Sequence, residues 1–359
     1  MSFITKWLYT HLGTTSNVFF EHMGHRACLL LNLSSTCVVN LLTATTKSGH
    51  PIKRADSFSA HHMKAFAQLI LRIVALTGLY FVVFSTVSAI LIPTTQPPTA
   101  DNELNVVTAL LIVSLLNTAV LSYVILHSRA SGWRLFASLF VVFFGVSTFM
   151  SQIETAIFVT WLPAGLLTRI VLSGLLVSLT FSCLAVLVLG KWRTREKFEP
   201  RRLNLTKSQW ALRLIVLASL YVIIYFTFGY FLAWRNPAVR AFYHGSDLTD
   251  FFTQIKSVFT DTPWLPPFQL LRGVLWTLLA LPVIRMMKGQ WWEAGIAVAL
   301  CFGVLMSSLL LIPNPLMPKE VRLAHLWETA SSNFLFGWMV VIVLVRWGRN
   351  RAHNSTDRA

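Results

Sequence analysis

The sequence contains few charged residues. Only 12% of its 359 residues are Asp, Glu, Lys or Arg, whereas 55% are hydrophobic, and the mean hydropathy is +0.62. Soluble globular chains usually carry about 25% charged residues. This shortage excludes an ordinary soluble domain and is what a lipid-facing surface requires. We therefore expect an integral membrane protein.

Acidic residues are the scarcer kind of charge. The chain has 14 Asp and Glu against 30 Lys and Arg, and its formal net charge is +16. In a soluble protein this excess would indicate nucleic-acid binding, but there is no Walker loop, no zinc-finger spacing and no basic helix interleaved with stacking aromatic residues. The basic residues lie mainly in short loops between apolar runs. We interpret them as determinants of membrane topology and as contacts to anionic lipids at the cytoplasmic face, and we expect no nucleic-acid partner.

Cysteine pairs and catalytic motifs are missing as well. The four cysteines form no CxxC pair, and we interpret them as small buried hydrophobic residues. The sequence has no HExxH zinc motif and no GxSxG nucleophile elbow. We therefore expect no metal and no cofactor, and the missing motifs argue against an enzyme.

Long apolar segments are what the sequence does contain. Each is about 20 residues long, enough to cross a hydrocarbon core of ~30 Å, and turn or breaker residues separate them. The sequence predicts an all-α, polytopic membrane helix bundle. Its expected spans, eight in number, are 72–92, 107–127, 135–159, 166–190, 210–234, 267–287, 292–312 and 323–345.

The distribution of Lys and Arg predicts the orientation of these spans. The loop 191–209 is rich in basic residues, and further basic residues stand in the breaks around 129–134 and 285–288 and after residue 345. With eight spans, these breaks all fall on one side of the membrane, so both termini are predicted to be cytoplasmic. Residues 63–345 would form the transmembrane domain and 346–359 a basic cytoplasmic tail. We expect a bacterial cytoplasmic (inner) membrane protein.

The first 62 residues differ from the rest, because they show no clear helical period. We expect residues 1–62 to be a poorly structured extension, with Met63 as the functional start. The alternative is an additional span at residues 27–44.

The break 235–266 is long enough to hold structure outside the membrane. Residues 246–260 predict an amphipathic helix, capped by Ser246 or Asp247, with Leu248 and several phenylalanines on one face. One interpretation is an interfacial helix that lies on the membrane. The other is a lid over an outward-facing cavity.

Within the seventh span, Gly295, Ala299 and Gly303 recur at a spacing of four residues. This pattern of small residues predicts close helix packing rather than chemistry.

Ionisable residues inside the spans indicate a polar site. Such residues are costly in a bilayer, so they usually face the protein interior and mark function. Because a helix rises about 1.5 Å per residue, the two acids Glu154 and Glu328, the two arginines Arg169 and Arg272, and His325 are all expected at one depth in the outer leaflet. Neighbouring polar residues form stripes that can face one another. The predicted site comprises Gln152, Glu154, Arg169, Gln269, Arg272, His325, Glu328 and Ser332.

Several roles fit such a site. It could be a structural ion-pair network without a ligand, a pathway for a ligand or ion, or a metal or hydrolytic site. In the last case His325 and Glu328 would share a metal with Glu154 or with the external His244 and Asp247, although the spacing of a known metal motif is missing.

The leading functional hypothesis is a small-molecule or ion transporter, or a subunit of a transport assembly. Glu154 and Glu328 would bind a proton or cation, Arg272 would be their counter-ion or an anion clamp, and His325 would titrate. The alternative is a membrane-embedded enzyme that acts on a lipid or lipid-linked substrate, with one Glu as general base and Arg272 holding a phosphate.

Overall fold

A computed structural model describes residues 53–92, 105–159, 161–193, 200–201, 203–245, 247–314 and 316–347, with side chains from residue 63 onward. By their internal contacts the residues divide into the units Met1–Ala67 and Gln68–Ala359. In the first unit the described residues are helical from Lys53, which precedes the expected start at Met63. Residues 1–52, including the alternative span 27–44, and the tail from 348 lie outside the described residues.

Eight of the described helices are long and apolar enough to cross a membrane. The described residues contain no β-strand, only an isolated bridge between Ser128 and Met287. The predicted all-α polytopic bundle is thus confirmed. The candidate spans are Met63–Leu91, Val106–Leu126, Gly132–Phe158, Leu166–Val188, Lys207–Trp234, Leu265–Met286, Trp291–Leu311 and Lys319–Arg346.

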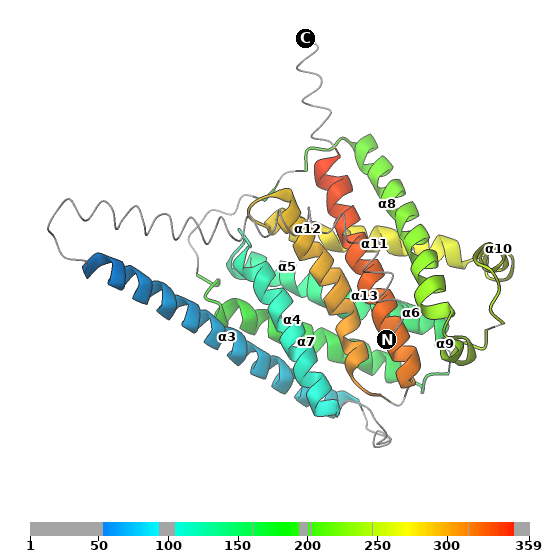
Figure 1. Ribbon diagram of the computed structural model, residues 1–359, viewed down its shortest axis with the longest axis horizontal. Helices are drawn as coiled ribbons and strands as arrows, with labels where there is room; N and C mark the ends of the chain where they lie inside the picture. The colour runs from blue at the N-terminus through cyan, green and yellow to red at the C-terminus, as the bar shows by residue number, and fades with distance from the viewer. Residues whose placement is uncertain are drawn as a thin grey trace, which may run out of the picture. The chain divides into compact units, whose positions relative to one another are not determined.

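Short π-helical turns interrupt four of these spans, which the hydropathy pattern does not predict. The elements (Figure 1) are α3 (Lys53–Leu91), α4 (Val106–Leu126), α5 (Gly132–Phe144), η1 (Gly145–Phe149), α6 (Met150–Phe158), α7 (Leu166–Val188), α8 (Lys207–Phe228), η2 (Gly229–Trp234), α9 (Pro237–Phe242), α10 (Phe251–Asp261), α11 (Leu265–Met286), α12 (Trp291–Leu300), η3 (Cys301–Leu305), the 3-10 turn η4 (Ser308–Leu311), α13 (Lys319–Val341) and η5 (Ile342–Arg346).

Capping residues, rather than the apolar runs, decide where helices begin. At the start of α8, the Thr206 hydroxyl accepts a hydrogen bond from the Gln209 N–H, and the Gln209 side chain accepts one from the Thr206 N–H. This capping box satisfies N–H groups that have no partner within the helix. The helix therefore begins at Lys207, ahead of the apolar run at residue 210.

Helix α10 begins later than the sequence suggests. Asp250, rather than Ser246 or Asp247, is its N-cap, because the Asp250 carboxylate accepts hydrogen bonds from the N–H groups of Phe252 and Thr253. Hydrogen bonds from the side chain and backbone of Thr253 hold the pKa of Asp250 below its usual value. Phe252 remains 79% exposed. Whether this apolar surface rests on the membrane or covers a cavity stays a prediction.

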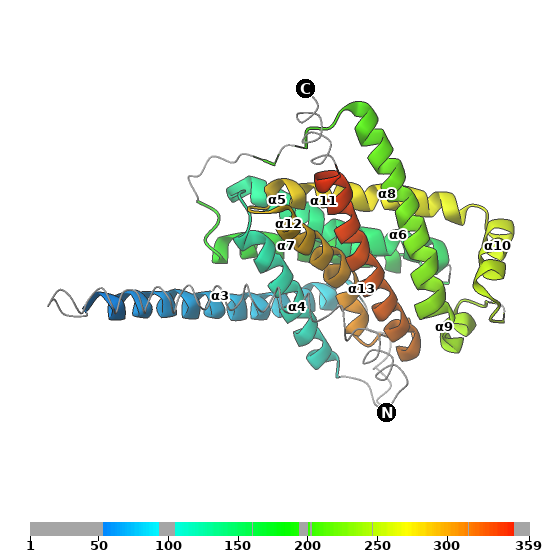
Figure 2. The same ribbon diagram turned by 45° about the horizontal axis from the view of Figure 1, so that its top comes forward.

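The basic loops gather at one end of the bundle. The Lys288 N–H donates to the His127 carbonyl at 2.7 Å, the Arg129 N–H donates to the Met286 carbonyl at 2.7 Å, and the Gly132 N–H donates to the Lys191 carbonyl at 2.9 Å. The loops after α4, α7 and α11 therefore lie together (Figure 2). We call this end, formed by residues 127–131, 189–193, 200–201, 203–206 and 287–290, the basic end. That it faces the cytoplasm stays a prediction.

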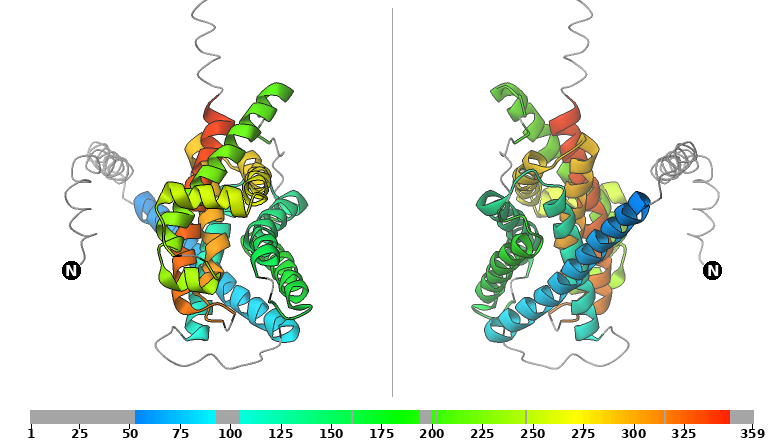
Figure 3. Two further views of the ribbon diagram at one scale, coloured as in Figure 1. Left: turned by 90° about the vertical axis from the view of Figure 1, so that its right-hand side faces the viewer. Right: turned by 90° about the vertical axis from the view of Figure 1, so that its left-hand side faces the viewer.

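Helix α11 is central to the arrangement of the helices. It packs against α8 on one side and against α5 on the other, while α5 pairs with α7 and α12 pairs with α13 (Figure 3). Gly273 on α11 allows the approach of α8, because a Cβ there would lie 2.8 Å from the Cα of Ala218. A polar side chain on α11 is thus enclosed by neighbouring helices.

The ridge of small residues on the seventh span serves packing, as predicted. A Cβ on Gly303 would lie 3.0 Å from the carbonyl oxygen of Ala330 on α13. On the opposing helix, a Cβ on Gly337 would lie 2.7 Å from the Cα of Ala299. The two helices can approach this closely only because the contact positions lack side chains.

We expect Gly337→Ala to destabilise the protein by about 1–3 kcal/mol, because the added methyl group meets backbone that cannot move aside. Thermal unfolding of the purified protein in detergent measures the effect. Gly78→Ala is the matched control, since nothing lies within 4 Å of a Cβ built there. Equal stability of the two variants would contradict the packing argument.

Candidate functional site

The site is built around Arg272, a buried arginine on α11 that is 2% exposed. Its Nη1 donates to Glu154 Oε1 at 2.5 Å and its Nη2 donates to Glu154 Oε2 at 3.0 Å. Glu154 lies on α6, on the other side of α11 from α8. The two-pronged geometry matches the planar guanidinium to the carboxylate and strengthens each hydrogen bond. This ion pair joins α6 to α11 at the end of the bundle where α6 ends and α11 begins.

Further contacts hold the Arg272 guanidinium in place. Its Nη1 also donates to Gln269 Oε1 at 3.0 Å, and its Nη2 approaches the carbonyl oxygen of Met150 at 3.4 Å. The rings of Tyr221 and Phe268 lie 5.7 and 5.9 Å from the guanidinium carbon. Gln269 is fully buried. Five groups therefore surround the guanidinium: a carboxylate, an amide, a backbone carbonyl and two aromatic rings.

A second charged pair lies on α13. His325 Nδ1 is 2.7 Å from Glu328 Oε2, and the two residues are neighbours at i and i+3 on the helix. The other ring nitrogen of His325, Nε2, is 3.1 Å from the hydroxyl oxygen of Tyr243. Both nitrogens of the imidazole thus have a partner, which orients the ring.

Tyr243 was not predicted to belong to the site. It follows α9, which packs against the start of α13 through Val239 and Val321 (Figure 2). Burial raises the pKa of the Tyr243 phenol, and the carboxylates of Glu154 and Glu328 raise it further. The hydroxyl therefore keeps its proton at neutral pH. No sequence period marks Tyr243, because the fold of the loop after α8 brings it to His325.

The two pairs belong to one group of interacting charges. The charge of Glu154 interacts with those of Arg272, Glu328 and His325. Gly229, in the π turn that ends the α8 span, lies beside Glu328, since a Cβ there would be 3.5 Å from Glu328 Oε1. We call the group the polar cluster. It lies at the end of the bundle opposite the basic end and consists of Glu154, Tyr243, Gln269, Arg272, His325 and Glu328.

Three residues of the predicted site lie apart from these contacts. Arg169 is exposed on α7 and makes no side-chain hydrogen bond or ion pair within the part of the chain that the structure describes. Gln152 donates to its neighbour Ser151, and the Ser332 hydroxyl donates to the Thr329 carbonyl of its own helix. Depth along a helix can be counted from the sequence, but the direction in which a side chain points depends on how the helices pack.

Some polar atoms of the cluster have no partner among the described residues. The Gln269 Nε2 and the Arg272 Nε are buried there without a hydrogen bond. Buried polar groups are usually satisfied, so each exception calls for an explanation. These atoms leave the cluster able to bind a further polar group.

The described residues contain no group of three His, Cys, Asp or Glu side chains that could hold a metal ion. Comparisons with known protein families, with curated proteins and with solved structures found no match to this chain.

We expect Arg272→Met to cost about 3 kcal/mol of stability, because it leaves a carboxylate without its partner in a poorly hydrated site. The double variant Arg272→Met with Glu154→Gln should recover most of that loss. Chemical unfolding of the purified protein in detergent provides the two free energies. Arg169→Met is the control for losing an exposed arginine and should stay within about 0.5 kcal/mol of the wild type. A double variant as unstable as Arg272→Met would show that the ion pair is not the source of the loss.

Proposed function

We propose that the polar cluster binds a proton or a small cation and that the protein uses this binding to move an ion or small molecule across the membrane. The observation that carries the proposal is an imbalance of charge. The cluster contains two carboxylates but one arginine, and the remaining basic group is a histidine. Histidine is the side chain whose ordinary titration falls near physiological pH.

The sum of charges depends on His325. With both carboxylates ionised and Arg272 positive, a neutral His325 leaves the cluster with one negative charge in excess. Burying an uncompensated charge among membrane helices is costly. One proton or one monovalent cation balances the cluster, so the site favours taking up a single positive charge.

The geometry around His325 suits the transfer of a proton. When His325 is neutral, its Nδ1–H donates to Glu328 and its Nε2 accepts from the Tyr243 hydroxyl. When it is protonated, Nε2–H donates to the Tyr243 oxygen instead. The same heavy-atom distances, 2.7 and 3.1 Å, serve both states. Tyr243, outside the spans, thus links the loop end of the bundle to Glu328 within it.

The unpartnered atoms support a ligand over a purely structural network. A network whose role is to lock helices is most stable when every member is satisfied. Here the Gln269 Nε2 and the Arg272 Nε have no partner among the described residues, and as N–H donors they suit an acceptor such as water beside the ion pair rather than the cation itself. In the transport hypothesis Arg272 holds Glu154 in place, Glu328 carries the proton or cation, and His325 titrates.

The setting of this activity is a further part of the proposal. The predicted topology places the polar cluster at the outer face of a bacterial inner membrane and the basic end in the cytoplasm, where anionic lipids concentrate.

The first test combines binding and flux. Purified protein is screened by thermal shift between pH 5 and pH 8 against Li⁺, Na⁺ and K⁺, and proteoliposomes with a trapped pH dye report proton movement under each ion gradient. We expect one of these ions, or protons alone, to stabilise the wild type by mass action, by about 2.7 kcal/mol at one hundred times the dissociation constant. Glu328→Gln should abolish this response and the flux while leaving the fold intact, because it removes the excess negative charge.

Glu320→Gln is the matched control, because Glu320 is exposed near the start of the same helix. Turnover of a lipid substrate in detergent, without a sealed compartment, would instead favour a membrane-embedded enzyme. A wild type that responds to neither pH nor cations would contradict the proposal.

A separate prediction concerns Tyr243. Replacing it by Phe removes the hydroxyl that faces His325, so proton flux should fall about tenfold, the effect of losing one hydrogen bond of about 1.4 kcal/mol. Tyr230→Phe controls for the loss of a tyrosine hydroxyl at the neighbouring end of the α8 span, since the Tyr230 hydroxyl donates to the Thr249 carbonyl at 2.6 Å. Equal flux in the two variants would remove Tyr243 from the proposed path.

A further inference from the structure

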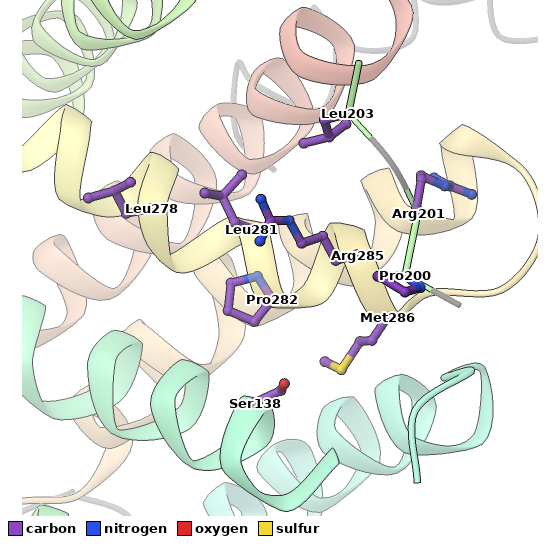
Figure 4. A pocket seen from close by; sticks show the side chains of 9 residues that line it. All are labelled: Ser138, Pro200, Arg201, Leu203, Leu278, Leu281, Pro282, Arg285 and Met286. Carbon is purple, nitrogen blue, oxygen red and sulfur yellow. The ribbon is translucent and has the colours of Figure 1, made fainter. Parts of the chain in front are cut away.

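A second site lies near the basic end, away from the polar cluster. A cavity of about 610 Å³ opens between α5 and α11, beside Pro200, Arg201 and Leu203 (Figure 4). Its lining combines apolar side chains with two arginines, and none of its lining residues is acidic. The residues used below are Ser138, Arg201, Leu278, Leu281, Pro282 and Arg285.

Arg285 supplies the charge of this cavity. It lies in the last turn of α11, it is exposed, and its side chain makes no hydrogen bond or ion pair with any described residue. Figure 4 shows its guanidinium folded back toward Leu281 and Pro282. Arg201 stands at the other side of the opening, where its Nη2 donates to the Gly289 carbonyl at 2.6 Å. Two positive charges without a lining acid favour an anionic ligand.

The inner part of the cavity has a different character. Leu281 and Leu278 line it one and two turns deeper than Arg285, so the apolar part extends about 10 Å along α11 at 1.5 Å per residue. Leu278 is 47% exposed. The positive charge of Arg285 therefore lies near the opening of the cavity, and the apolar wall continues from there toward the middle of the membrane.

Pro282 adds a polar feature to the same wall. Proline has no N–H, so the carbonyl of Leu278, four residues earlier, loses its helical donor. Leu278 and the hydroxyl-bearing Ser138 both line the cavity. The lining thus includes a hydroxyl group as well as two cations, and a polar headgroup can hydrogen-bond to it.

We propose that this cavity binds an anionic phospholipid, with the phosphate at Arg285 and an acyl chain against Leu278 and Leu281. Basic pockets between membrane helices are suited to lipid headgroups, and arginine matches the geometry of a phosphate. The apolar depth selects a lipid over free phosphate. This proposal is independent of transport, because it shares no residue with the polar cluster.

The experiment uses the full chain in detergent and phosphatidylglycerol as the probe. Native mass spectrometry counts the lipids that stay bound, and thermal shift measures the stabilisation as lipid is titrated. We expect phosphatidylglycerol to stabilise the wild type and phosphatidylcholine to do so much less. Arg285→Gln should weaken the apparent affinity at least about tenfold, the effect of one lost hydrogen bond to a charged group. Leu281→Trp should weaken it as well, because the larger ring fills the apolar part while both arginines remain.

Arg193→Gln is the matched control, since Arg193 is an exposed arginine of the same end that does not line the cavity. It should bind phosphatidylglycerol like the wild type. Equal weakening by Arg193→Gln and Arg285→Gln would overturn the proposal, because it would indicate general attraction to a basic surface. Undiminished binding by Leu281→Trp, or equal protection by inorganic phosphate, would overturn the assignment to a lipid.

Discussion

The structure depends on the burial of one guanidinium group. Moving a charge of this kind out of water costs on the order of 20 kcal/mol in the idealised limit, and several kcal/mol in real proteins. Arg272 avoids most of that cost through a two-pronged contact with Glu154, a hydrogen bond to Gln269 and the nearby rings of Tyr221 and Phe268. Gln269 and Phe268 belong to α11 itself, whereas Glu154 and Tyr221 come from α6 and α8. Once the arginine is buried, α6, α8 and α11 must therefore meet at this level, and the close approach of α8 at Gly273 follows from the same requirement.

The second carboxylate, Glu328, gives the cluster a property beyond holding helices together. Glu328 has a histidine as its partner, so the charge of the pair can change while that of Arg272 and Glu154 stays fixed. A structural network would gain nothing from a titrating member, whereas a site that takes up and releases a positive charge requires one. The imidazole lies between Glu328 and Tyr243, and the hydrogen bond between its Nε2 and the Tyr243 hydroxyl can reverse its direction without moving a heavy atom, while the bond to Glu328 is kept. This is the physical basis on which we favour proton or cation binding.

The two ends of the bundle differ in how they use charge. At the polar cluster, opposite charges pair within the protein. At the basic end, positive charges exceed negative ones, and backbone hydrogen bonds between loops hold them in a common rim. The cavity beside Arg285 lies at this rim, and there we propose that a lipid binds. The two proposals thus assign a lipid to one end of the bundle and a proton or cation to the other.

The sequence by itself determined the number, order and approximate limits of the spans, because hydropathy over about 20 residues is a local property that the bilayer thickness makes decisive. It also determined the depth of Glu154, Arg272, His325 and Glu328, because the helical rise is constant. Only the tertiary structure decided which of the polar residues at that depth meet. Arg169 is exposed on α7, and Gln152 and Ser332 form hydrogen bonds within their own helices. Tyr243, from a loop, contacts His325. The direction of a side chain depends on helix rotation, on π turns and on close packing at positions such as Gly303 and Gly337. Helix rotation and close packing are set between pairs of helices, so no single stretch of the chain determines them.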